Sequence, residues 1–236
     1  MRSSRSVPDP LDPGPKGFAH RGVHRGSDFP ENSLIAFAAA LEAGAGIECD
    51  LRLTMDDQIV VFHDAETKRI CGSTMRIGQS RLADLGRLKV GDGPIPTLES
   101  LLVLVRAQVP LLLEVKVEND IWRWTPALKR VLGDYGGPFG VMSFDARIPR
   151  LLKTNLPAMR RGLVVKDRLS GWKRFWAMRL ADPQFIAVET AALGKPWVAK
   201  ARRRMPVYTW TVRNPDLRRQ AEVHADASIW EDDGRP

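Results

Sequence analysis

The chain has 236 residues, of which 44% are hydrophobic and 27% are charged. This composition is that of a globular protein and argues against a disordered, collagen-like or membrane-spanning chain. Lysine and arginine outnumber aspartate and glutamate by 36 to 28, so the formal net charge is +8 and anionic partners are favoured. The basic residues are dispersed and accompany no nucleic-acid-binding motif, so we expect no nucleic acid partner.

The N-terminal segment and the cysteines indicate the cellular compartment of the protein. Cys49 and Cys71 are too few for a disulfide framework, which favours a reducing interior, and no apolar core of a secretory signal follows the first residues. We therefore expect a cytoplasmic protein. Residues 1–16 contain four prolines and are expected to form an extended tail that lies on the surface or is disordered. Residues 17–236 are expected to form one domain.

From Lys16 onward, short apolar runs alternate with longer segments of helical periodicity, which is typical of parallel βα units. The expected strands cover residues 17–19, 47–53, 111–117, 139–143, 161–165, 185–188, 205–211 and 227–230, with a further run at 59–62. The expected helices cover residues 32–43 with Asn32 as the N-cap, 98–107 with Thr97 as the N-cap, 121–132, 147–155, 171–180, 195–203 and 215–222. Eight strands with helices between them predict an α/β fold of the (β/α)8 TIM-barrel type.

Two segments interrupt this alternation. Residues 65–96 are rich in glycine and proline and lack a sustained apolar period, which predicts an irregular insertion after the second strand, of a size typical of binding loops or lids. The chain stops soon after the eighth expected strand, so a last covering helix is expected to be short or missing.

Charged residues stand inside two of the apolar strands. Glu48 and Asp50 are separated by one residue and therefore project to the same side of the second strand. Glu114 and Lys116 repeat this arrangement in the third strand. Interior salt bridges, such as Glu114 with Lys116 or Glu48 with Arg52, are the structural alternative. The grouping of three carboxylates at one barrel end favours a functional site.

Clustered carboxylates repel one another unless a cation binds between them, and an all-oxygen ligand set suits Mg²⁺ or Ca²⁺ better than zinc. His20 ends the first expected strand, and His63 follows the run at 59–62. Both histidines are expected at the same barrel end as the carboxylates, where they would be free for proton transfer.

A series of motifs occurs in order along the chain: His20-Arg21-Gly22, Pro30-Glu31-Asn32-Ser33, Glu48-Cys49-Asp50-Leu51, Val60-Val61-Phe62-His63-Asp64, Ile95-Pro96-Thr97-Leu98-Glu99, Leu113-Glu114-Val115-Lys116, Ser143-Phe144 and Trp210-Thr211-Val212. Together they closely resemble the glycerophosphodiester phosphodiesterase family, over about residues 17 to 230. The resemblance implies a TIM barrel with a small insertion after the second strand. It also implies hydrolysis of glycerophosphodiesters to glycerol 3-phosphate and an alcohol, with a divalent cation.

The resemblance also implies roles for single residues. Glu48, Asp50 and Glu114 match the metal ligands of the family, and His20 and His63 match its acid/base pair. One histidine would deprotonate the attacking oxygen, which is either water or the glycerol 2-hydroxyl, and the other would protonate the leaving alkoxide.

Further positions are matched more loosely. Arg21 and Lys116 correspond to phosphate-contacting positions of the family. Trp210 matches the tryptophan of the Trp-Thr-Val motif and would form an apolar wall for the glycerol moiety, with simple packing as the alternative. Glu31 is expected to support the metal shell or its loop, and His24 is expected to be a loop residue and not a catalyst.

Two features leave the interpretation open at the edges of the barrel. The C-terminal segment from Asp226 departs from the family's usual Asp-Gly-Ile-Ile-Thr-Asp pattern, so the resemblance does not extend to the substrate-side wall there. The tryptophans in helical segments fit either burial, which we prefer, or a membrane-facing patch; they are Trp122, Trp124, Trp172 and Trp176.

Two alternative functions therefore remain. One is a lysophospholipase-D-like activity on lysophospholipids at a membrane surface, since membrane contact is compatible with the charge and the tryptophans but is not required. The other is a non-catalytic barrel that binds a phosphate-containing ligand. The oligomeric state is not predicted by the sequence.

Overall fold

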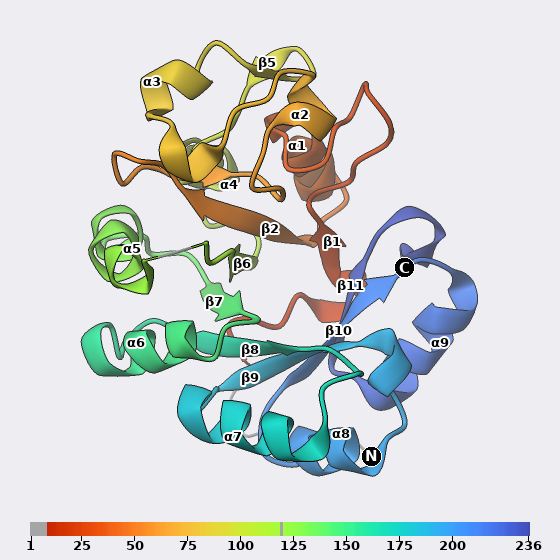
Figure 1. Ribbon diagram of the computed structural model, residues 1–236. Coiled ribbons are helices and arrows are strands. Elements are labelled where there is room, and N and C mark those ends of the chain that lie inside the picture. The colour runs from red at the N-terminus through yellow and green to blue at the C-terminus, as the bar shows by residue number, and fades with distance from the viewer. Residues whose placement is uncertain (1–8, 119) are drawn as a thin grey trace.

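The computed structural model describes residues 9–118 and 120–236, and within these residues eight parallel strands close into a barrel. In spatial order the strands are β1 (Phe18–His20), β2 (Gly46–Leu53), β6 (Leu111–Val115), β7 (Phe139–Ser143), β8 (Arg161–Val165), β9 (Phe185–Glu189), β10 (Val207–Val212) and β11 (Ala227–Trp230). The barrel closes because β1 pairs with both β2 and β11. β3 (Ile59–Val61) adds to the end of β2 in antiparallel orientation. The predicted (β/α)8 barrel is confirmed (Figure 1).

Helices follow the strands and cover the outer face of the barrel (Figure 1). They are α1 (Leu34–Glu42), α4 (Leu98–Val105), α5 (Trp124–Leu132), α6 (Arg147–Asn155), α7 (Gly171–Ala181), α8 (Pro196–Arg202) and α9 (Pro215–His224). α4 begins as predicted, because the Thr97 hydroxyl accepts a hydrogen bond from the Ser100 amide at 3.1 Å. After β11 the described residues form a 3-10 helix, η5 (Asp232–Gly234).

The start of α1 differs from the prediction. Ser33, and not Asn32, is the N-cap, since its hydroxyl accepts a hydrogen bond from the Ala36 amide at 3.2 Å. Asn32 adopts a left-handed conformation with φ 56°. Its side-chain amide donates to Asp50 at 2.9 Å instead. The residue expected to cap the helix therefore supports a carboxylate of the candidate site.

The insertion after β3 contains short elements that the sequence did not predict. They are α2 (Lys68–Cys71), η2 (Ile77–Gln79), α3 (Leu82–Leu85) and the hairpin of β4 (Lys89–Val90) and β5 (Gly93–Pro94). These elements surround a small apolar core formed by Val60, Phe62, Ile77, Leu85, Val90 and Ile95. Elements of two to four residues are too short to show a hydrophobic period, so the segment looked irregular.

An apolar cluster fills the amino end of the barrel interior; it contains Leu11, Phe18, Leu112, Met142, Val164, Phe185, Ala187, Tyr208, Ala227 and Ile229. Strand side chains alternate, so the residue two positions further along each strand also points inward, nearer the carboxyl end. His20 follows Phe18 in this way. The same step leads to Glu114, Trp210 and Glu231 in β6, in β10 and just after β11. The alternation of the strand side chains therefore produces two layers in the barrel interior. The apolar layer at the amino end is the apolar floor, and the polar layer lies at the barrel mouth, which is formed by the carboxyl ends of the parallel strands.

Residues 9–16 of the expected tail lie at the amino end of the barrel, where most of them are exposed but Leu11 is buried. Leu11 is 1% exposed and belongs to the apolar floor. Asp9 forms an ion pair with Arg160, with Oδ2 2.6 Å from Nη2. Burial of one leucine and one ion pair holds this part of the segment at the amino end of the barrel, and residues 1–8 lie outside the described residues.

The preference for buried tryptophans is wrong for three of the four. Trp124 is 3% exposed, but Trp122, Trp172 and Trp176 are 68%, 66% and 59% exposed. These three side chains lie on the outer sides of their helices, away from the strands. Among the described residues, no helix is both long and apolar enough to cross a membrane.

Candidate active site

Three buried carboxylates meet at the barrel mouth. Glu48 and Asp50 come from β2 and Glu114 from β6, where Asp50 and Glu114 are register partners. Each residue offers an oxygen atom, and these atoms lie within 4.8 Å of one another. The exposed fractions are 1% for Glu48, 0% for Asp50 and 7% for Glu114. Three carboxylates at such a site require cationic compensation.

Two basic side chains supply part of this compensation. Lys116 Nζ lies 2.9 Å from Asp50 Oδ1 and also contacts Glu114. Arg21 Nε lies 3.0 Å from Asp50 Oδ2, and the Arg21 amide donates to Glu48 Oε2 at 3.1 Å. The Glu114–Lys116 pair considered as a structural alternative is present, but it is part of this larger cluster.

The other pair considered from the sequence, Glu48 with Arg52, does not form. Arg52 Nε and Nη2 donate to the His63 carbonyl oxygen at 2.9 and 2.6 Å, and Nη1 contacts Glu118. Arg52 therefore holds the backbone at His63 and pairs with Glu118 in place of Glu48.

The carboxylates differ in how easily they lose a proton. Burial, followed by repulsion from Asp50 and Glu114, raises the pKa of Glu48 well above its usual range. Burial also raises the pKa of Glu114 to about 7, against the attraction of Lys116. Burial acts in the same direction on Asp50, but Lys116 and Arg21 overcome it and hold the pKa of Asp50 well below its usual range.

The residues present fit a hard divalent cation. Asp50 Oδ1 is buried and lies 2.9 Å from the Lys116 ammonium, in a geometry that does not make a regular hydrogen bond. Burial, above all, raises the pKa values of Glu48 and Glu114, so these two carboxyl groups lose their protons less readily than Asp50 unless a further cation stabilises the ionised form. A carboxylate-only donor set suits Mg²⁺ or Ca²⁺.

His20 is held by a carboxylate that the sequence interpretation missed. Its Nδ1 lies 2.5 Å from Glu231 Oε2, and its Nε2 lies 3.9 Å from Glu48 Oε2. The contact with Glu231 places a proton on Nδ1, so in the neutral ring Nε2 carries the free lone pair and faces the carboxylates. Burial lowers the pKa of His20, although Glu231 opposes this effect.

His63 has a similar arrangement. Its Nδ1 lies 2.7 Å from Asp64 Oδ1. Burial lowers the pKa of His63, against the attraction of Asp50, and its side chain remains 33% exposed. Both histidines are therefore kept predominantly neutral near pH 7, each with Nδ1 occupied by a carboxylate.

The insertion is tied to the site through Glu31, which lies outside the carboxylate cluster. Glu31 accepts hydrogen bonds from Arg21 at 2.9 Å and from Arg69 of α2 at 2.9 and 2.7 Å. Arg69 Nε also donates to Asp64 at 2.6 Å. Arg69 thus links Glu31, which binds Arg21, to Asp64, which binds His63. Glu31 supports the site in this structure through Arg21.

Aromatic rings line one side of the barrel mouth. The rings of Trp210 and Phe144 meet edge to face, with centroids 5.4 Å apart. Lys166 Nζ lies 4.9 Å from the centroid of Phe144, and Lys116 Nζ lies 5.7 Å from it. Trp210 Nε1 donates to the Ala187 carbonyl at 3.2 Å, which fixes the ring. Trp210 and Phe144 therefore form a rigid apolar wall beside Lys116.

Glu231 is the main site residue that sequence reasoning missed. The signal was available, because Glu231 stands two positions after the inward-facing Ile229. The strand was expected to end at residue 230, one position before Glu231, and this segment departs from the family pattern. His24 lies near the same carboxylate, with Nε2 3.6 Å from Glu231 Oε2, in the loop after β1.

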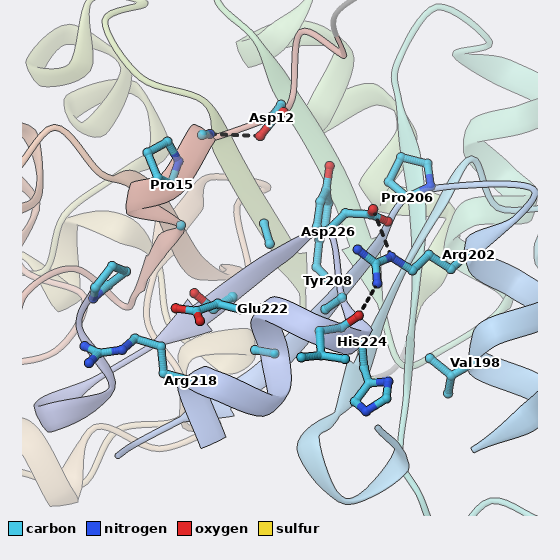
Figure 2. A pocket seen from close by; sticks show the side chains of 18 of the residues that line it. Asp12, Pro15, Val198, Arg202, Pro206, Tyr208, Arg218, Glu222, His224 and Asp226 are labelled. Carbon is cyan, nitrogen blue, oxygen red and sulfur yellow. Dashed lines mark hydrogen bonds and ion pairs between the residues drawn. The ribbon is translucent and has the colours of Figure 1, made fainter. Parts of the chain in front are cut away.

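A cavity of about 970 Å³ lies at the opposite end of the barrel, between residues 9–17, α8 and α9 (Figure 2). Its charged side chains are largely engaged with the protein itself: Arg202 Nε donates to Asp226 at 3.1 Å and Nη1 to the Val223 carbonyl at 2.7 Å. This cavity lies at the amino ends of the strands, whereas the active sites of parallel barrels lie at the carboxyl ends. The chemistry is therefore assigned to the barrel mouth.

Comparison with known proteins agrees with this geometry. The model of the Glycerophosphoryl diester phosphodiesterase family matches residues 20–232. A glycerophosphodiester phosphodiesterase of Bacillus altitudinis is 36% identical over 121 residues, which are 46% of this chain and 47% of that relative. The matched region thus spans about half the length of that relative. A glycerophosphodiester phosphodiesterase of Caldanaerobacter subterraneus is 26% identical over 91% of this chain and 93% of that relative.

Among solved structures, an Oleispira antarctica phosphodiesterase in complex with sn-glycerol-3-phosphate superposes with a TM-score of 0.82 at 22% identity, over 93% of this chain and 94% of that one. The fold and the family match define a phosphoric diester hydrolase. The chain belongs to the glycerophosphoryl diester phosphodiesterase family.

Proposed function

We propose that this chain hydrolyses glycerophosphodiesters to glycerol 3-phosphate and an alcohol, with a divalent cation held by Glu48, Asp50 and Glu114. The observation that carries the proposal is the buried carboxylate cluster beside two histidines whose Nδ1 atoms are each held by a carboxylate. Family membership supports the reaction class, and the relative solved with sn-glycerol-3-phosphate supports the product.

The three carboxylates would hold Mg²⁺ or Ca²⁺, which when bound neutralises charge on the non-bridging oxygens of the phosphodiester. Arg21 and Lys116 stand beside the cluster with partly buried cationic groups that Asp50 holds in place. They would bind further phosphate oxygens and orient the diester for in-line attack. Since both are held in place by Asp50 before substrate arrives, this orientation needs little reorganisation.

The histidines would carry the proton transfers. One neutral imidazole accepts the proton of the attacking oxygen, and the other, once protonated, donates a proton to the leaving alkoxide. Glu231 and Asp64 stabilise the imidazolium that forms at His20 and His63 and keep each ring in one tautomer. Glu231 and Asp64 would thus support the acid/base function of His20 and His63.

The wall of Trp210 and Phe144 would contact the carbon atoms of the glycerol moiety. It lies beside Lys116, so a phosphate bound by Lys116 would place its glycerol carbons near these rings. An aromatic wall gives apolar contact and no hydrogen bonds, which suits a short polyol backbone whose hydroxyl groups face elsewhere.

The test is a panel of phosphodiesters incubated with the purified full chain and Mg²⁺ or Ca²⁺. We expect glycerol 3-phosphate from glycerophosphocholine and glycerophosphoethanolamine, with no product in excess EDTA. Turnover of lysophosphatidylcholine alone would indicate the lysophospholipase-D-like function and contradict the proposal. No turnover of any diester with saturating metal would indicate a ligand-binding barrel and would also contradict it.

A further inference from the structure

Helix α7 carries an exposed apolar surface that the catalytic site does not use. It is formed by Trp172, Phe175, Trp176 and Leu180, which are 66%, 56%, 59% and 45% exposed. We call these four residues the α7 patch. Their spacing of three, four and eight residues places them on one side of the helix. The rings of Phe175 and Trp176 contact each other edge to face, with centroids 5.4 Å apart.

The opposite side of α7 already fulfils the packing role of a barrel helix. Ala177, Met178 and Ala181 pack against the apolar layer outside β8 and β9. The α7 patch therefore adds nothing to the core and, among the described residues, remains uncovered. Three aromatic side chains on an exposed helix surface mark an interaction site and not a packing surface.

The charge around the patch is positive. Lys173 and Arg179 are exposed on α7, Arg168 is exposed in the loop before it, and α7 contains no acidic residue. The two acidic residues that flank the helix are already paired. Asp167 contacts Lys195, and Asp182 Oδ2 lies 2.7 Å from Lys153 Nζ. Neither flanking acidic residue therefore cancels the positive charge that Lys173, Arg179 and Arg168 present to an anionic surface.

We propose that the α7 patch docks this protein onto anionic lipid bilayers. Tryptophan, phenylalanine and leucine on one side of a helix, flanked by lysine and arginine, are typical of helices that lie in the membrane interface. The rings enter the boundary between head groups and acyl chains, and the basic side chains contact lipid phosphates. A second copy of the chain fits the surface less well, because a symmetric contact would bring the same basic residues together.

The position of α7 has a consequence for the orientation of the docked protein. α7 follows β8, so its first turn, which carries Trp172, lies near the barrel mouth. Lys166 at the end of β8 lies over Phe144 of the aromatic wall. α7 lies on the side of the barrel away from the insertion (Figure 1). Docking by α7 would thus bring the barrel mouth near the lipid surface and leave the insertion in water.

The proposal can be tested with the full chain and 100-nm vesicles, independently of the proposed activity. Vesicles of phosphatidylglycerol and phosphatidylcholine, or of phosphatidylcholine alone, are sedimented with the protein at low and high salt. We expect binding to the anionic vesicles, at least tenfold weaker binding to phosphatidylcholine alone, and weaker binding at high salt. The double variant Trp172→Ala/Trp176→Ala should bind anionic vesicles at least tenfold more weakly, with unchanged circular dichroism and unchanged turnover of a water-soluble diester.

Trp122→Ala is the matched control, because this tryptophan is at least as exposed as Trp172 and Trp176 but lies on the 3-10 helix η3 (Ile121–Arg123). It should bind anionic vesicles as the wild type does. An equal loss in the control and in the double variant would overturn the assignment to α7, as would a wild-type chain that does not bind anionic vesicles. A wild-type dimer that becomes monomeric in the double variant, without vesicle binding, would assign the patch to a contact between copies and also overturn the proposal.

Discussion

His20 Nδ1 and Glu231 Oε2 lie 2.5 Å apart, although 211 positions separate the two residues in the chain. The barrel closure brings them together. β1 and β11 pair in parallel with Ala19 opposite Trp230, so the next residues along the chain are His20, which ends β1, and Glu231, which follows β11. Both side chains point into the barrel mouth. The seam of the barrel therefore assembles a histidine–carboxylate pair from the first and last strands.

This pair makes a prediction for Glu231→Gln. We expect kcat to fall by roughly 10- to 100-fold with little change in KM, because the glutamine no longer stabilises the imidazolium of His20. Glu231 raises the pKa of His20 against the effect of burial, so its removal should move the corresponding limb of the pH–rate profile to lower pH. Arg213→Gln, which removes the exposed partner of Glu231, is the control and should change kcat less than threefold. A profile of Glu231→Gln that superposes on that of the wild type would contradict the assignment.

The two histidines should each be indispensable for turnover. His20→Ala and His63→Ala are expected to lower kcat by at least about a hundredfold, because each removes one proton transfer. Circular dichroism and thermal unfolding establish that the fold is intact. His24→Ala is the matched control, since His24 lies beside Glu231, the partner of His20, but is not proposed to transfer a proton. If either His20→Ala or His63→Ala keeps nearly normal turnover, the acid/base assignment is wrong.

Metal binding should depend on pH. Burial raises the pKa of Glu114 to about 7 in the metal-free protein, and the pKa of Glu48 is raised well above its usual range. Ligation requires the ionised carboxylates, so Mg²⁺ binding should release protons and weaken about tenfold per pH unit for each proton released below pH 7. Isothermal titration calorimetry in two buffers of different ionisation enthalpy counts these protons at pH 6 and pH 8. Equal Mg²⁺ affinity at pH 6 and pH 8, with no proton release, would contradict the raised pKa values of Glu48 and Glu114.

Leu11 should contribute to stability although it lies in the N-terminal segment. Leu11→Ala is expected to lower the free energy of unfolding by about 2–4 kcal/mol, because it leaves a void in the apolar floor of the barrel. Urea unfolding followed by circular dichroism measures the change. Val103→Ala, at a position that is 69% exposed on α4, should stay within about 0.5 kcal/mol of the wild type. A similar small effect for Leu11→Ala would show that residues 9–16 are not part of the core in solution.

Much of the barrel could be predicted from the sequence because its strands are continuous apolar runs between helical segments. The two-residue period also indicated which charged residues share one side of β2 and β6. The sequence alone therefore predicts that Glu48, Asp50 and Glu114 lie together. The same period applied to the last strand leads from Ile229 to Glu231, so Glu231 could be predicted in the same way.

Other features could not be predicted, for identifiable physical reasons. Asn32 and Ser33 can both cap a helix, and only the position of Asp50 decides that Asn32 is engaged elsewhere. α7 has apolar residues on both of its sides, so its periodicity does not reveal which side faces the barrel, and Trp172 and Trp176 are exposed as a result. Ion pairs such as the one from Arg69 to Glu31 depend on the path of the insertion, which has no sequence period.

The central claim is that Glu48, Asp50 and Glu114 hold the cation that turnover requires. The most direct test is the dependence of glycerol 3-phosphate release from glycerophosphocholine on Mg²⁺ concentration, in the wild type and in Glu48→Gln. We predict no release by the wild type in excess EDTA, full recovery with added Mg²⁺, and at least a tenfold higher Mg²⁺ requirement for Glu48→Gln. Undiminished release in EDTA, or the same Mg²⁺ dependence in both proteins, would contradict the account.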